Sequence, residues 1–192
     1  MAQRSLTPAT LRPTTIGMLL FLLSEATFFL VLILMFISAR AEAPAGMTGV
    51  ERLDPWRAGM FTLALLASSG TIWLAERNQH MNRRGALRLW LVATLTLGAI
   101  FLAGQATEYA GLIREGMTVA TSLFGTHFYT LTGLHFLHVT AGVVLIAVLA
   151  LLALRGKRSE PGIGALQPIS AYWHFVDGVW IVLYVVIYLV RP

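Results

Sequence analysis

Five long apolar stretches, separated by short polar segments, run through the sequence. They cover residues 16–38, 56–75, 87–106, 127–154 and 169–189. A helix of about 20 mostly apolar residues is long enough to cross the hydrocarbon of a bilayer. None of the stretches alternates apolar and polar residues as a strand of a membrane barrel does, and a spanning segment must satisfy its own backbone hydrogen bonds. The pattern therefore predicts an all-α membrane protein built as a bundle of five transmembrane helices.

The connecting segments predict one membrane domain over residues 1–192. Each is short and carries Pro or Gly, and none is long enough to act as a linker between domains. Lys and Arg are more frequent in the N-terminal tail and in the second and fourth connections than in the other segments. Because basic residues favour the cytoplasmic side of a membrane, this bias predicts a cytoplasmic N-terminus and a C-terminus outside.

Composition agrees with a membrane protein and excludes several other classes. Charged residues make up 12% of the chain, against roughly 25% in soluble proteins. The chain has no Cys, so it has neither a disulfide framework nor a thiolate metal site. The net charge of +5 comes from basic residues in the connections, which suits a membrane surface, and we expect no nucleic-acid partner. We expect Arg155, Lys157 and Arg158 to set the topology and to bind lipid phosphates.

One acidic residue, Glu25, interrupts the first apolar stretch. It lies about nine residues into the predicted helix, roughly 14 Å from its start. A carboxyl at that depth must be neutral, hydrogen-bonded or paired. Two interpretations stay open, a proton-exchanging site and an interhelical hydrogen bond that fixes packing. The best partners are His135 and His138, at a comparable depth in the fourth stretch, and we expect a hydrogen bond to His138.

Three histidines, His127, His135 and His138, share one face of the fourth predicted helix, because their offsets of eight and eleven residues place them within about an 80° stripe. Such a stripe could hold a copper ion or a haem. A haem would need an opposed ligand on another helix, and His174 is the candidate. In the alternative interpretation the histidines donate hydrogen bonds across the bundle. We expect no metal or haem in this chain.

Two further acids are notable: Asp177 lies within the fifth apolar stretch, and Glu108 lies just beyond the third. Asp177 follows His174 by three residues, so the two can meet on one helix face. We expect Asp177 to face protein and to pair with His174 or with a polar group of the fourth helix. Glu108 follows Gln105, either at an interfacial helix end or in a functional site. The small residues 68–70 are expected to let two helices approach closely.

Five short motifs, in the same order along the chain, resemble the signatures of subunit III of the haem-copper respiratory oxidases. They are FLLSEATFF at residues 21–29, SSGTIW at 68–73, GQATEY at 104–109, TGLHFLHV at 132–139 and YWHFVDGVW at 172–180. The first resembles the sequence around the carbodiimide-reactive glutamate of that family, which corresponds to Glu25. The chain is similar to the short, five-helix bacterial form and lacks the first two helices of the seven-helix form.

The resemblance implies an accessory subunit of a proton-pumping terminal oxidase that reduces oxygen to water. In that family the haems and coppers belong to subunits I and II, and subunit III has no redox centre and no catalytic residue. The implied role is to pack against subunit I, to support its proton uptake and stability, and to bind phospholipid. The implied location is the bacterial plasma membrane.

Other assignments stay open at this point. The accessory protein of nitric oxide reductases is a short relative within the same family. A free-standing proton-coupled transporter is a second alternative, although an internal repeat and broken helices, which transporters often show, are not evident in the sequence. A third alternative, a b-type cytochrome, would show a haem absorption band in the isolated chain.

Overall fold

The computed structural model describes residues 13–42, 53–120, 122–155 and 165–190, and these residues form helices joined by turns. The helices are α1 (Pro13–Ala41), α2 (Pro55–His80), α3 (Arg84–Arg114), α4 (Leu123–Arg155), α5 (Leu166–Tyr184) and the π-helix η3 (Val185–Leu189), which continues α5. All five α-helices, α5 together with η3, are long and apolar enough to cross a membrane. The predicted all-α bundle of five spanning helices is confirmed.

The helices extend beyond the apolar stretches from which they were predicted. A helix does not end where hydrocarbon ends, because polar residues can continue it into the headgroup region. The start of α2 shows a local signal for a boundary. The Asp54 carboxylate accepts hydrogen bonds from the backbone N–H groups of Trp56 and Arg57, at 3.0 and 3.2 Å. Pro55 occupies the first helical position, where its missing N–H costs nothing.

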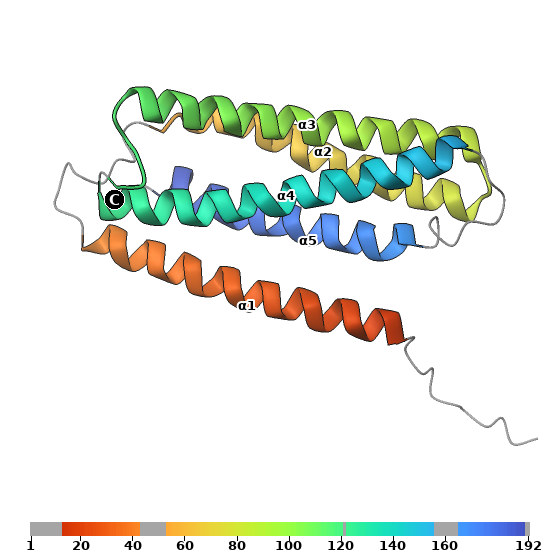
Figure 1. Cartoon of the computed structure of the whole chain (residues 1–192), viewed down its shortest axis with the longest axis horizontal. Coiled ribbons are helices and arrows are strands. Elements are labelled where there is room, and N and C mark those ends of the chain that lie inside the picture. Colours follow the sequence, from red (N-terminus) through yellow and green to blue (C-terminus); the bar gives the residue numbers. More distant parts are fainter. Residues whose placement is uncertain (1–12, 43–52, 121, 156–164, 191–192) are drawn as a thin grey trace, which may run out of the picture.

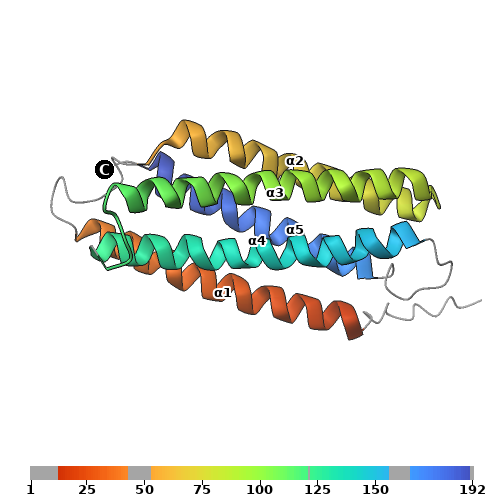
Figure 2. The same ribbon diagram turned by 45° about the horizontal axis from the view of Figure 1, so that its top comes forward.

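Helices α2, α3, α4 and α5 form a closed ring, and α1 lies outside it. In the ring, α2 packs against α3 and α5, and α4 packs against the same two helices. The first helix, α1, packs mainly on α4 and α5 and lies along the outer edge of the bundle (Figures 1 and 2). Much of its surface is apolar and exposed, including Leu20 and Leu23, which are 63% and 65% exposed.

Two tryptophans of α5 fill the centre of the ring. The Trp173 side chain is fully buried and fits against two glycines, where a Cβ at Gly98 or Gly142 would come within 3.1 or 2.7 Å of the indole ring. Its Nε1–H donates to Ser68 Oγ on α2 at 2.9 Å. About two turns further along α5, Trp180 Nε1–H donates to Thr62 Oγ1 at 2.9 Å. Both indoles therefore combine apolar packing with a satisfied polar atom, as a buried Trp requires.

The end of the last helix is tied to α1 by an arginine. Arg40 Nη1 donates to the Val186 carbonyl at 2.9 Å, and its Nη2 donates to the carbonyl of Val190. The last carbonyls of a helix lack partners within the helix, and a cation there is favoured by the helix dipole. The side chain thus joins the end of α1 to the end of the last helix.

Candidate functional site

A carboxyl and an imidazole meet on the seam between α1 and α4. Glu25 Oε2 lies 3.0 Å from His138 Nε2, so the hydrogen bond predicted between these residues is confirmed. Their side chains are 22% and 19% exposed. The pair is therefore neither sealed in the core nor fully open to the membrane.

The other contacts of His138 fix how many protons the pair holds. Its Nδ1 lies 2.7 Å from the Leu134 carbonyl, and because a carbonyl can only accept, Nδ1 carries a proton. The contact between Nε2 and Glu25 then contains one more proton, on the carboxyl of a neutral pair or on the imidazole of an ion pair. The Tyr172 hydroxyl donates to the His138 carbonyl at 3.0 Å, which links the same turn of α4 to α5.

The next histidine on α4 has a different environment. His135 is 1% exposed, and neither ring nitrogen has a hydrogen-bond partner among the described residues. Its ring stacks on Trp180 with centroids 4.9 Å apart and has Phe29 and Phe101 at its edges, both at 6.2 Å. His135 therefore acts as an aromatic ring in the core and is not the partner of Glu25.

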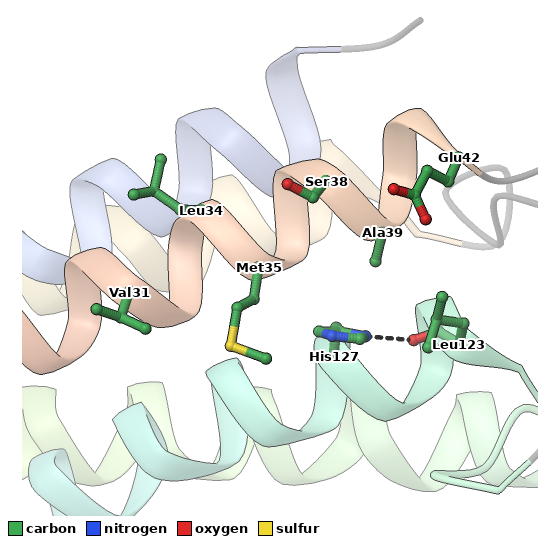
Figure 3. Close-up of a pocket in the computed structure, with 8 residues that line it drawn as sticks. All are labelled: Val31, Leu34, Met35, Ser38, Ala39, Glu42, Leu123 and His127. Atoms are coloured by element: carbon green, nitrogen blue, oxygen red, sulfur yellow. Dashed lines mark hydrogen bonds between the residues drawn. The ribbon is translucent and has the colours of Figure 1, made fainter.

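The third histidine of the stripe lies in an open groove between α1 and α4. Its ring contacts its own helix, with His127 Nδ1 2.8 Å from the Leu123 carbonyl. The groove, of about 390 Å³, is mainly apolar, with Glu42 at the end of α1 as its acidic member (Figure 3). Its lining residues are Val31, Leu34, Met35, Ser38, Ala39, Glu42, Leu123 and His127.

The histidines are thus not gathered into one metal site. In the described part of the chain, no group of three or more His, Cys, Asp or Glu side chains could hold a metal ion. His174, considered from the sequence as an opposed haem ligand, instead contacts Ser69 of α2. A shared helical stripe does not bring side chains together when successive residues along it face different neighbours.

A second polar cluster lies on the seam between α2 and α5. Ser69 Oγ donates to Asp177 Oδ2, and Ser69 Oγ also lies 2.9 Å from His174 Nδ1. Asp177 is 2% exposed, so the prediction that it faces protein is confirmed. The prediction of its hydrogen-bond partner was wrong. The hydroxyl that binds it comes from α2 and not from α4, and His174 is joined to it only through Ser69. The cause is that α5 turns Asp177 toward α2, where a serine interpreted as a small spacer also supplies a hydroxyl.

The third acid, Glu108, lies inside α3, which continues to Arg114. The helix therefore does not end near Glu108, as was predicted, but continues six residues beyond it. Glu108 Oε2 accepts a hydrogen bond from the buried Tyr188 hydroxyl at 2.9 Å and a longer one from Gln105 at 3.4 Å. The contact with Tyr188 was not predicted, because nothing in the sequence relates a tyrosine at the chain's end to an acid 80 residues earlier.

Of the basic residues predicted to bind lipid, the structure describes Arg155. Arg155 is the last residue of α4 and is exposed; Lys157 and Arg158 lie outside the described residues. A nearby arginine has another function, since Arg88 Nε donates to the Ala153 carbonyl at 2.8 Å. This bond satisfies one of the free carbonyls at the end of α4.

Comparison with known proteins gives one consistent result. A family model described as cytochrome c oxidase subunit III matches residues 3–191. The chain is 38% identical to a probable cytochrome c oxidase subunit 3 of Mycobacterium leprae, covering 92% of this chain and 88% of the relative. It is 36% identical to the cytochrome c oxidase subunit 3 of Corynebacterium diphtheriae, with the same coverage. It is 37% identical to that of a Synechocystis species, covering 90% and 74%. The chain belongs to the cytochrome c oxidase subunit III family.

Proposed function

We propose that this chain is an accessory subunit of a proton-pumping haem-copper oxidase in a bacterial plasma membrane. It packs with the subunits that carry the haems and coppers, holds no redox centre and contributes no catalytic residue. Membership of the subunit III family supports a place in an oxidase complex. The five apolar helices support a multi-pass membrane protein. We place the N-terminus in the cytoplasm and treat the chain as one membrane domain.

The observation that carries the proposed support of proton uptake is the Glu25–His138 pair. Its two side chains form a bond at 3.0 Å that holds one exchangeable proton, in a position about one fifth exposed at the surface of the bundle. A buried pair could not exchange that proton with a neighbouring subunit, and a fully exposed carboxyl would be untenable in hydrocarbon. The pair fixes α1 on α4 and buffers protons beside the uptake path of subunit I.

Lipid binding is a second part of the proposed function. The guanidinium of Arg155 lies at the end of α4, where charge-assisted bonds to a phosphate are available, and Lys157 and Arg158 follow it in the sequence. The apolar groove between α1 and α4, toward the opposite end of α4, is suited to an acyl chain.

Purification tests the proposal as a whole. A tagged form of the full chain, extracted in mild detergent from its own membrane, should bring down two larger subunits, haem absorption and copper, and the complex should consume oxygen. Recovery of the chain alone would contradict the proposal. Co-purification with a nitric oxide reductase, or a haem spectrum from the isolated chain, would replace it with one of the alternative assignments.

A further inference from the structure

Three polar side chains on the seam between α2 and α5 form a continuous line of contacts that the proposed function does not use. Ser69 Oγ lies 2.9 Å from His174 Nδ1, and the same hydroxyl donates to Asp177 Oδ2. His174 is exposed, whereas Asp177 is 2% exposed. One hydroxyl of α2 therefore connects an imidazole at the surface of α5 to a buried carboxyl of the same helix.

The bridging hydroxyl can make these two contacts in two ways, because it has one proton to donate and lone pairs that accept. In the first arrangement, His174 Nδ1–H donates to Ser69 Oγ, and the Ser69 hydroxyl donates to the Asp177 carboxylate. In the second arrangement, a protonated Asp177 donates to Ser69 Oγ, and the Ser69 hydroxyl donates to a bare Nδ1. Both arrangements use the same heavy atoms in the same positions, so a change between them requires no movement of the helices.

The two arrangements differ by the transfer of one proton. The Nδ1–H bond of a His174 imidazolium breaks as its proton passes to Ser69 Oγ. At the same time the original O–H bond of Ser69 breaks as its proton passes to Asp177 Oδ2. An imidazolium and a carboxylate are thereby converted into a neutral imidazole and a neutral carboxylic acid, with the serine unchanged. No electron is transferred, and the step needs no further reactant.

The buried carboxyl is suited to hold the transferred proton. Asp177 Oδ1 has no hydrogen-bond partner among the described residues. A carboxylate shares its negative charge between both oxygens, and a buried charge without a partner is costly. In the neutral acid this oxygen is an uncharged carbonyl oxygen, which costs less to leave unmatched. The surroundings of Asp177 therefore compensate part of the cost of taking the proton from the imidazole.

The other end of this line of contacts lies toward the charged end of α2. Glu76, two turns after the bridging serine, is close enough to His174 for the two to interact electrostatically, and a carboxylate attracts a proton to a neighbouring imidazole. Glu76 also lines a surface pocket of about 340 Å³ together with Arg77 and His80, near the end of α2. Among the described residues, no charged group of α1 or α4 acts on His174 or Asp177. Exchange of protons with the surroundings therefore takes place at His174.

We propose that His174, Ser69 and Asp177 form a proton-binding site, in which a proton taken up by the His174 imidazole passes through the Ser69 hydroxyl and is held on the buried Asp177 carboxyl. The site is separate from the Glu25–His138 pair, where a carboxyl and an imidazole touch directly and share a proton without a bridge. The inference goes beyond the proposed function, because it assigns a proton-binding property to this chain by itself and requires no other subunit.

Infrared spectroscopy of the purified full chain in detergent micelles tests the transfer. The carbonyl stretch of a protonated carboxyl shifts when its proton is replaced by deuterium, and the band that disappears in Asp177→Asn belongs to Asp177. After rapid transfer into D₂O, Ser69→Ala and His174→Phe should each slow the shift of this band by about tenfold or more, because each removes a hydrogen-bonding group through which the proton passes. A serine that only holds the two helices together would have the opposite effect, because its loss would loosen the seam and speed the exchange.

Ser68→Ala is the matched control, since it removes a hydroxyl from the adjacent position of α2 that bonds to Trp173. This variant should not slow the exchange at Asp177. Exchange that is unchanged or faster in Ser69→Ala or in His174→Phe would overturn the inference. An equal slowing in Ser68→Ala, or the absence of any protonated-carboxyl band that depends on Asp177, would also overturn it. None of these measurements depends on recovering an oxidase subunit, so their failure is distinguishable from failure of the proposed function.

Discussion

The contact between Glu25 and His138 makes a prediction that depends on proton count. Because His138 Nδ1 donates to the Leu134 carbonyl, the neutral ring offers Nε2 as an acceptor, and the side chain opposite it must donate. A glutamine at position 25 can donate from its amide, and its side chain has the same length as that of a protonated glutamate. Glu25→Gln should therefore retain the bond, whereas Glu25→Leu should leave Nε2 without a partner.

The size of the effect follows from the burial of the pair. A buried acceptor left unmatched costs about 1–3 kcal/mol, and since the two side chains are 22% and 19% exposed, the lower half of that range applies. Glu25→Leu should lower the free energy of unfolding by about 1–2 kcal/mol, which is roughly a 5–30-fold change in the unfolding equilibrium. Glu25→Gln should stay within about 0.5 kcal/mol of the original protein.

Reversible unfolding of the purified chain in mixed detergent micelles, followed by tryptophan fluorescence, measures this difference. Carbodiimide labelling at position 25 should be lost in both variants and serves as a check on the substitution. If Glu25→Gln proves as unstable as Glu25→Leu, the contact requires a negative charge and the neutral pair is wrong. In the assembled complex Glu25→Gln should leave oxygen reduction largely intact. Loss of oxygen reduction there would place Glu25 on an obligatory proton route.

Three further predictions concern packing, the buried acid of α5 and lipid. Gly142→Ala should destabilise the bundle by about 1–3 kcal/mol, because its Cβ would lie 2.7 Å from the indole ring packed on it. Gly133→Ala on the same helix meets nothing within 4 Å and should stabilise by up to about 1 kcal/mol, and thermal unfolding in detergent distinguishes the two. Ser69→Ala removes the hydroxyl bound to the buried carboxylate of α5 and should cost about 1–3 kcal/mol in the same assay; an unchanged unfolding midpoint would show that the bond adds no stability. Changing Arg155 and Lys157 together to Ala should lower the phospholipid retained by the purified complex, measured as phosphorus per haem, and unchanged lipid content would count against headgroup binding.

The spanning helices and the contact between Glu25 and His138 could be predicted from sequence for the same reason, which is that the membrane acts as an apolar solvent. In a membrane, the solvent imposes a length on each helix, so apolar stretches reveal the spans directly. The solvent also limits the partners of a buried carboxyl to polar groups at the same depth. That left His135 and His138 as the candidates for Glu25, and the contact with His138 was predicted correctly.

The contacts that sequence did not reveal depend on how each helix is rotated. Asp177 was expected to pair with His174 or α4, but the rotation of α5 places it against Ser69 on α2. Likewise, the bond from Tyr188 to Glu108 requires knowing that Tyr188 of η3 lies beside α3. Helix rotation is set by tertiary packing, here by Trp173 between two glycines, and periodicity on one helix has no information about the facing helix.

The position of α1 has a consequence for biosynthesis. Its native neighbours are α4 and α5, which follow α2 and α3 in the chain, and its Arg40 bonds to the carbonyl of Val186 in η3. The hairpin of α2 and α3 can pack as soon as it is inserted, but α1 must wait in lipid with Glu25 unpaired until α4, which carries His138, has been inserted. Helix α1 is therefore inserted first but packs late. Between these two events the Glu25 carboxyl must be protonated or shielded by a membrane insertase.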